Sequence, residues 1–113
     1  MKKVQKPWGY ELWFAETKHY IGKILFVRAG SRLSLQYHIS KDESIYLYKG
    51  RMEFWSGTSV NSLDKTILEE GEARHIPPGL LHRFCALTDC FIFEVSTPHP
   101  NDVVRVEDDY DRA

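Results

Sequence analysis

Residues 30–43 read Gly-Ser-Arg-Leu-Ser-Leu-Gln-Tyr-His-Ile-Ser-Lys-Asp-Glu, and this stretch decides the fold. Side chains two residues apart on a strand share a face, so Gln36 and His38 project together. A short turn then brings Glu43 up on the next strand. This stretch supplies one half of a polar site.

A second stretch supplies the other half of the site. Residues 71–82 read Gly-Glu-Ala-Arg-His-Ile-Pro-Pro-Gly-Leu-Leu-His. The Pro-Pro-Gly turn aims His82 back inward, because proline and glycine fix the chain reversal. Taken together, the two stretches predict a metal site with four ligands, namely Gln36, His38, Glu43 and His82.

The rest of the chain has the pattern of many short strands joined by tight turns. Apolar or alternating runs are separated by Gly, Pro, Asn and Asp. We expect an all-β fold closed as a sandwich or barrel, while residues 1–6 and 107–113 are polar enough to fray unless something packs on them. The expected strands cover residues 10–14, 20–28, 32–38, 44–48, 51–56, 65–69, 73–76, 81–87 and 90–96.

Length and charge exclude several classes of protein. The chain has 113 residues, which predicts a single domain over 1–113. A net charge of −1, from 15 basic and 16 acidic residues, gives no reason to expect nucleic acid or an anionic membrane as partner. No apolar run approaches the ~20 residues that cross a bilayer, and Pro7 follows the Lys-rich start. We therefore expect a soluble, cytoplasmic protein.

Two cysteines flank a short connection and could face each other across a hairpin. In a reducing cytosol, Cys85 and Cys90 are better interpreted as small buried apolar side chains than as a disulfide. Their spacing is not Cys-x-x-Cys, so a thiolate zinc site has no support.

The two polar stretches resemble the paired motifs of the cupin superfamily. The first cupin motif places metal ligands and a carboxylate between glycines, and the second ends on a histidine after Pro-x-Gly. This resemblance implies a cupin double-stranded β-helix, a jelly-roll barrel. The chain departs from most cupins in having Gln36 where histidine is usual, and Ala86 where asparagine is usual.

A narrower resemblance, to the cupin domain of type II mannose-6-phosphate isomerases, extends along most of the chain. The sequence Leu-Ser-Leu-Gln-x-His is similar to that family, whose Gln, His, Glu, His set binds zinc or a similar ion. The terminal motif departs from the family, since Asp111 replaces its usual glycine. The other matching positions are Lys6-Pro7-Trp8-Gly9, Lys23, His82-Arg83, Glu94-Val95 and the segment 102–110.

The ligand types themselves favour a divalent ion. Nitrogen and oxygen ligands without sulfur suit zinc, manganese, iron, nickel or cobalt. With the resemblance, zinc is the first expectation, and the leading hypothesis is interconversion of a phosphorylated aldose and ketose. In that reaction the metal stabilises an enediol-like intermediate.

Isomerisation also needs a general base and a phosphate site. The sequence leaves the base open among Lys23, Glu53, His75 and Glu94, with Lys23 and Glu94 favoured. Guanidinium groups bind phosphate in a planar, two-pronged way, so Arg83 and Arg105 are the candidate phosphate ligands, with a catalytic part for Arg83. Trp8 is a candidate sugar-binding residue through the isomerase resemblance.

Two other functions remain open from the sequence. His38, Glu43 and His82 alone make the facial triad of an iron(II) oxygenase. The chain could also be a non-catalytic module that binds a sugar through the metal. Exposed sheet edges further favour a homodimer.

Overall fold

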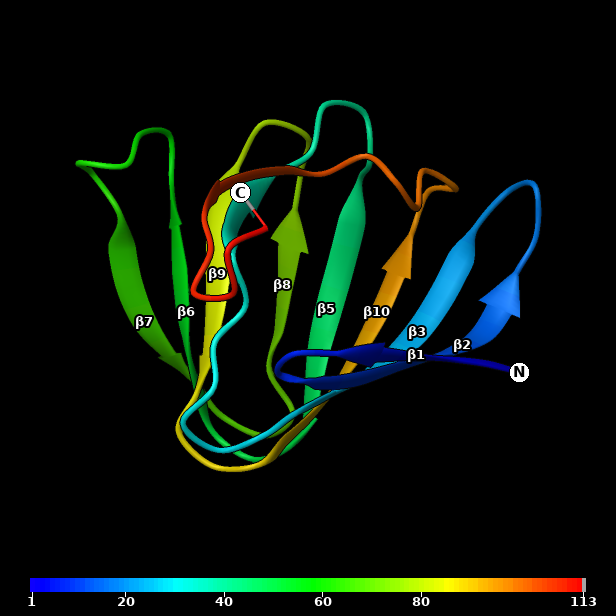
Figure 1. Ribbon diagram of the computed structural model, residues 1–113, viewed down its shortest axis with the longest axis horizontal. Coiled ribbons are helices and arrows are strands. Elements are labelled where there is room, and N and C mark those ends of the chain that lie inside the picture. The colour runs from blue at the N-terminus through cyan, green and yellow to red at the C-terminus, as the bar shows by residue number, and fades with distance from the viewer. Residues whose placement is uncertain (113) are drawn as a thin grey trace.

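The computed structural model describes residues 1–112 and consists of two antiparallel sheets. Figure 1 shows them as the opposite walls of a barrel, with β6, β7 and β9 on one side and β2, β3 and β10 on the other. The larger sheet has the order β1 (Lys2–Lys6), β2 (Gly9–Glu16), β3 (Ile21–Val27), β10 (Cys90–Ser96), β5 (Glu43–Lys49) and β8 (Ala73–Ile76). The smaller sheet has the order β11 (Val104–Glu107), β4 (Leu35–Tyr37), β9 (Leu81–Ala86), β6 (Met52–Gly57) and β7 (Asp64–Leu68).

The all-β prediction is confirmed. Residues 1–112 contain no helix, and hence none that is long and apolar enough to span a membrane. Both β8 and β10 begin and end at the predicted residues. Cys85 on β9 and Cys90 on β10 are free thiols, and their strands belong to different sheets.

The start of the chain meets the stated exception to fraying, because Lys2–Lys6 pairs with β2 along its whole length. The backbone of this edge strand gains a ladder of hydrogen bonds from β2. Its lysines also lie over aromatic rings, with Lys2 3.7 Å from the ring centre of Trp13 and Lys3 4.4 Å from that of Tyr10. Ring quadrupoles attract such ammonium groups, so a polar strand is held at the sheet edge.

The interior divides into an apolar end and a polar end. Along β10 the inward side chains change from Cys90 and Ile92 to Glu94 and Ser96, and all four are buried. In the antiparallel neighbours β3 and β5, Lys23 lies opposite Glu94 and Glu43 lies opposite Ser96, so the polar side chains of the three strands lie at one end of the sheet. The buried polar side chains at this end include Lys23, His38, Lys41, Glu43, His82, Glu94 and Ser96.

Candidate metal centre

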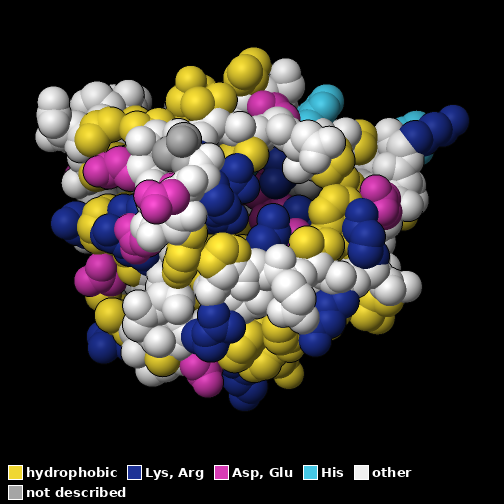
Figure 2. Space-filling model, viewed as in Figure 1, with side chains coloured by type: hydrophobic (Ala, Val, Ile, Leu, Met, Phe, Trp, Pro, Cys, Tyr) yellow, Lys and Arg dark blue, Asp and Glu magenta, His cyan; other side chains and the backbone are white. Residues whose placement is uncertain are grey.

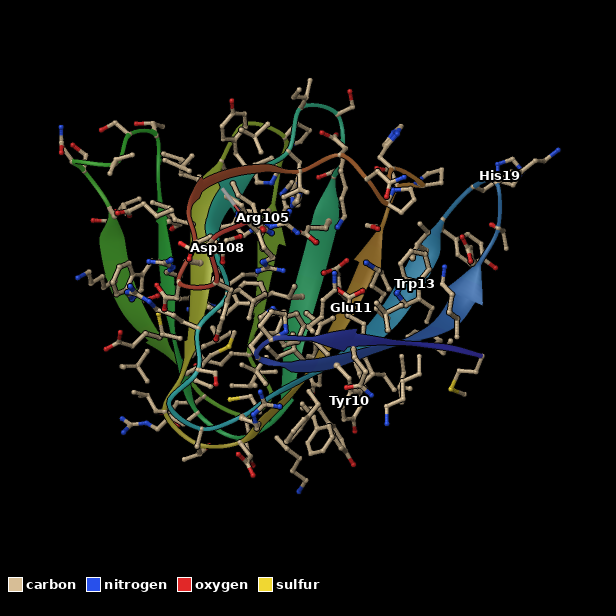
Figure 3. All side chains as sticks on the ribbon, in the orientation of Figure 1. Tyr10, Glu11, Trp13, His19, Arg105 and Asp108 are labelled. Atoms are coloured by element: carbon tan, nitrogen blue, oxygen red, sulfur yellow. The ribbon has the colours of Figure 1, made fainter. Side chains whose placement is uncertain are left out.

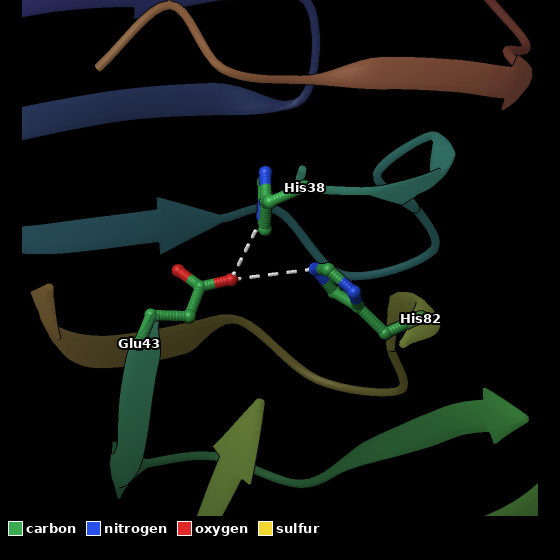
Figure 4. Close-up of side chains that lie close together, drawn as sticks. All are labelled: His38, Glu43 and His82. Atoms are coloured by element: carbon green, nitrogen blue, oxygen red, sulfur yellow. Dashed lines mark hydrogen bonds and ion pairs between the residues drawn. The ribbon is translucent and has the colours of Figure 1, made fainter. Parts of the chain in front are cut away.

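Three side chains from separate strands converge at the polar end of the barrel. His38 directly follows β4, Glu43 opens β5, and His82 lies on β9. Nε2 of His38 is 3.1 Å from Oε1 of Glu43, and Nε2 of His82 is 3.4 Å from the same oxygen (Figure 4). The potential ligand atoms all lie within 4.8 Å of one another, and each residue is buried.

Hydrogen bonds fix the orientation of both imidazole rings. Nδ1 of His38 lies 2.6 Å from the main-chain oxygen of Asp102, and Nδ1 of His82 lies 2.9 Å from that of Leu80. A carbonyl oxygen only accepts, so each Nδ1 carries a proton, and each ring turns its Nε2 toward Glu43. Such a partner for the distal nitrogen is typical of metal-ligating histidines.

The donor set fits a divalent cation. Two imidazole Nε2 atoms and one carboxylate face a single point, so once both Nε2 atoms are unprotonated their lone pairs need a positive charge among them. Nε2 of His82 is buried without a hydrogen-bond partner, which is costly unless another group satisfies it. Burial opposes a charged Glu43, yet the imidazoles and the Lys41 ammonium hold the pKa of this carboxyl well below its usual range. His38, Glu43 and His82 therefore form a candidate metal site.

Gln36 lies next to this triad. It is the cross-strand partner of His82, and it lines the same cavity. Its amide oxygen accepts a hydrogen bond from the Ser34 hydroxyl at 2.7 Å. A fourth ligand role for Gln36 stays a prediction.

The candidate metal site opens into a cavity of about 290 Å³. Figure 2 shows a hollow in the molecular surface with Lys and Arg side chains around it. This volume is just below the ~300–1,000 Å³ typical of ligand sites. Basic side chains outnumber acidic ones in the lining of this cavity. The acidic residues are Glu11, Glu43, Glu94 and Asp102, and the basic residues are Lys2, Lys6, Lys23, Lys41, Arg105 and Arg112.

A buried ammonium joins the triad to a second carboxylate. Nζ of Lys41 is 3.3 Å from Oε2 of Glu43 and 3.1 Å from Oε2 of Glu94. Burial and the charge of Glu43 raise the pKa of Glu94 to about 7, against the opposing effect of Lys41 and Lys23. Burial lowers the pKa of Lys41, but the two carboxylates outweigh it and raise that pKa overall.

Lys23 lies further along the same wall and has its own counter-ion. Its Nζ is 3.3 Å from Oε1 of Glu11 and 4.3 Å from the ring centre of Trp13. Trp13 Nε1 donates to the same Glu11 oxygen at 2.9 Å. Figure 3 shows Glu11 and Trp13 on one side of the β2 ribbon and Tyr10 on the other, as strand alternation requires.

Basic groups gather on the wall formed by the two ends of the chain. Arg105 on β11 is the strand neighbour of Gln36, and its Nε is buried without a hydrogen-bond partner. Arg112 and the half-buried Lys6 line the same cavity. Burial lowers the pKa of Lys6, and the charges of Lys23, Arg105 and Arg112 lower it further, against Glu11.

Three sequence-predicted residues lie elsewhere. Arg83 is buried outside the cavity lining, where its Nε donates to the Leu33 carbonyl at 2.8 Å. It follows His82 directly, so strand alternation turns it to the opposite face of β9. Glu53 accepts from Trp55 Nε1, and the exposed His75 pairs with Asp42; neither lines the cavity.

The structure brings the other predicted residues together. Trp8 is 3% exposed and belongs both to the cavity wall and to the apolar core. Glu11 and Lys41 also line the cavity and were not among the predicted residues. Lys41 had a signal, since it stands two residues before Glu43 and residues so spaced tend to share a face. Glu11 had none, because its contact with Lys23 depends on the pairing of β2 with β3.

Comparison with known proteins identifies the family. The mannose-6-phosphate isomerase C-terminal family matches residues 1–108. The xanthan biosynthesis protein XanB of Xanthomonas campestris pv. campestris is 29% identical over 117 residues. That match covers 99% of this chain but 24% of XanB, so the chain spans about a quarter of this relative.

Solved structures agree on the fold. The capsular polysaccharide assembling protein CapF of Staphylococcus aureus superposes with a TM-score of 0.81 at 17% identity, covering 94% of this chain and 31% of CapF. Bacillus subtilis oxalate decarboxylase, a protein with Mn(II) centres, gives 0.76 at 14% identity, covering 94% and 30%. At such identities the likeness shows the fold alone, and that fold is the predicted cupin jelly roll. The chain belongs to the mannose-6-phosphate isomerase C-terminal family, within the cupin superfamily.

Proposed function

We propose that this chain is a metal-dependent sugar-phosphate isomerase that interconverts an aldose and a ketose, of the mannose-6-phosphate isomerase type. One observation carries the proposal. A single cavity holds the candidate metal triad, the separate carboxylate of Glu94, and a basic wall that includes the unpartnered Nε of Arg105. Metal binding, proton transfer and phosphate binding thus have distinct groups around one small volume.

His38, Glu43 and His82 would hold the ion, with Gln36 as the proposed fourth ligand. When bound, a divalent ion supplies Lewis-acid polarisation of the sugar's carbonyl and hydroxyl oxygens. Zinc is the first candidate. Manganese is supported as an alternative by the Mn(II) centres of the oxalate decarboxylase with the same fold. Iron, nickel and cobalt also suit these ligands.

Glu94 is the proposed general base for moving a proton between adjacent carbons. It is buried in the cavity wall, and the Lys41 ammonium fixes one of its oxygens. Lys23, the other favoured candidate, faces Glu11 as an ion pair, so we assign it to hydrogen bonding with sugar hydroxyls. A positioned base contributes roughly 10²–10⁴-fold to such a step.

Arg105 is the proposed phosphate ligand. Its buried Nε has no hydrogen-bond partner among residues 1–112, and a phosphate oxygen would satisfy it. Lys6 and Arg112 line the same cavity and would add charge. Arg83 is not included in the proposed phosphate site, because its Nε donates a hydrogen bond to the Leu33 carbonyl. Trp8 contributes a rigid wall for the sugar.

Deuterium exchange tests the isomerase proposal. Metal-loaded protein is incubated with mannose 6-phosphate in D₂O, and the sugar is followed by NMR and mass spectrometry. We expect fructose 6-phosphate to form with deuterium at C1, and deuterium to appear at C2 of the recovered mannose 6-phosphate. Glu94→Gln should slow both conversion and exchange by ~10²-fold or more. A metal-loaded protein that binds the sugar without conversion or exchange would contradict the proposal and favour a sugar-binding module.

The triad itself supports an iron(II) oxygenase as the second candidate. Two histidines and one carboxylate are the ligands of that class, and here they converge. Oxygen uptake by the iron(II)-loaded protein with a panel of small substrates would support this candidate.

The homodimer also stays a prediction, which sedimentation velocity of the purified protein tests directly.

A further inference from the structure

Lys41 is a buried cation whose part in the proposed isomerisation is so far only its contact with one oxygen of Glu94. It is 6% exposed and lies between Glu43 and Glu94. A positive charge beside a metal ligand opposes metal binding by Coulomb repulsion. Burying an ammonium group there also costs free energy of desolvation. We therefore expect Lys41 to have a function that offsets this cost.

The backbone holds Lys41 firmly in this position. Its N–H donates to Oδ2 of Asp102 at 2.8 Å, and the N–H of Ser40 donates to the same oxygen at 2.7 Å. The Asp102 main-chain oxygen accepts from the His38 ring. The same loop therefore orients both the His38 ring, a proposed metal ligand, and the Lys41 ammonium. The position of Lys41 is thus fixed by the fold.

The two carboxylates that Lys41 contacts have different surroundings. Oε1 of Glu43 faces both imidazoles, whereas its Oε2 faces Lys41. Glu94 lies on β10, next to β5 in the sheet, and its Oε2 also faces Lys41. Carboxylates are good ligands for divalent ions, so a released Glu94 would be drawn toward an ion held by Glu43.

We infer that Lys41 is a positioning residue that keeps Glu94 out of the metal's coordination shell. The Lys41 ammonium contacts one oxygen of each carboxylate. Glu43 then binds the metal through its other oxygen, whereas Glu94 stays unbound to the metal and can act on the substrate. This inference rests on the proposed metal site and extends it, because it explains how adjacent carboxylates take different roles.

A Mn²⁺ titration of four proteins tests this inference. Wild type, Lys41→Met, Glu94→Gln and the double variant are titrated by calorimetry, without sugar. We expect Lys41→Met to bind Mn²⁺ at least tenfold more tightly than wild type, because Glu94 becomes a ligand. Adding Glu94→Gln to Lys41→Met should abolish most of that gain, whereas Glu94→Gln alone should change the affinity little. Lys41→Arg, which keeps the charge, should resemble wild type.

Other outcomes decide against the inference. Equal or weaker Mn²⁺ binding by Lys41→Met, or a gain that persists in the double variant, would overturn it and leave the metal site intact. If wild type binds neither Mn²⁺ nor Zn²⁺, the metal site and the inference fall together. Failure of isomerase activity alone does not affect the titration, since no sugar is present. Should Lys41→Met not fold, Lys41→Gln provides the same neutral test with a polar side chain.

Discussion

At the level of single residues, the alternation of side chains along a strand determines which groups reach the cavity. His38 and His82 were predicted to converge with Glu43, and they do. Arg83 was predicted as a substrate ligand, but a neighbour of an inward residue on a strand points outward. The cupin resemblance indicated which residue types matter, whereas the alternation of the strand determines which of them reach the cavity.

Arg105 should affect phosphate binding rather than folding. Its Nε is buried without a partner, so replacing Arg105 by Gln removes no internal hydrogen bond of that nitrogen. A hydrogen bond to a charged group contributes about 1.5–3 kcal/mol. We therefore expect Arg105→Gln to weaken binding of mannose 6-phosphate roughly tenfold or more, measured by calorimetry. Unchanged affinity would remove Arg105 from the phosphate site.

Arg83 should show the opposite behaviour. Its buried Nε donates to the Leu33 carbonyl, and its Nη2 lies 3.4 Å from the Glu107 carbonyl. Replacement by Met leaves the Leu33 acceptor without this donor, which costs about 1–3 kcal/mol. We expect urea denaturation of Arg83→Met to show that loss, with sugar-phosphate affinity retained. A folded variant of wild-type stability with weaker phosphate binding would return Arg83 to the site.

At the level of strands, apolar alternation predicted the elements whose side chains face the core. Strand β5, with buried Glu43, Ile45 and Leu47 between exposed residues, is an example. The same rule missed β1, whose sequence Lys-Lys-Val-Gln-Lys contains a single apolar residue. The stability of β1 depends on hydrogen bonds to the neighbouring strand β2. The sequence of residues 2–6 alone does not indicate that such a neighbour is present.

The loop between β4 and β5 should depend on Asp102. The carboxylate of this residue accepts hydrogen bonds from the main-chain N–H groups of Ile39, Ser40 and Lys41, at 2.7–2.9 Å. Replacing Asp102 by Ala removes all of these acceptors, so the amide protons of the loop should exchange faster with solvent. Hydrogen–deuterium exchange by NMR measures this effect, with the amides of β10 as the internal reference. Unchanged protection would show that the loop is held by other contacts.

The chain segment after β11 should be sensitive to acid. The guanidinium of Arg32, which binds both oxygens of Asp109 at 2.6 and 2.9 Å, holds the pKa of this carboxyl below its ordinary value of 3.8. Since the folded pKa is the lower one, the pair stabilises the fold fully above about pH 4 and loses this effect as the pH falls.

An Asp109→Asn variant tests this pH dependence. The difference in the free energy of unfolding between wild type and Asp109→Asn should be constant near neutral pH and shrink below about pH 4. Urea denaturation at a series of pH values provides the measurement. A difference that stays constant down to pH 2 would show that the Arg32 pair does not set the pKa of Asp109.

At the level of the whole molecule, the cavity is a product of sheet order. Lys23, Glu94 and Glu43 come from β3, β10 and β5, which are neighbours in the sheet but far apart in the sequence. On β10, Glu94 is the cross-strand partner of Lys23 on β3, and Ser96 is the cross-strand partner of Glu43 on β5. The motifs predicted the ligands, but this row of charges requires the complete topology, so no local pattern could have indicated it.

Metal content tests the central claim most directly. Wild type, His82→Ala and the control His75→Ala are loaded with Zn²⁺ or Mn²⁺, desalted and analysed for metal per chain. His75 is exposed and pairs with Asp42, so it serves as a matched histidine outside the cavity. We expect about one ion per chain in wild type and in His75→Ala, and almost none in His82→Ala. Equal metal content in wild type and His82→Ala would contradict the proposed centre.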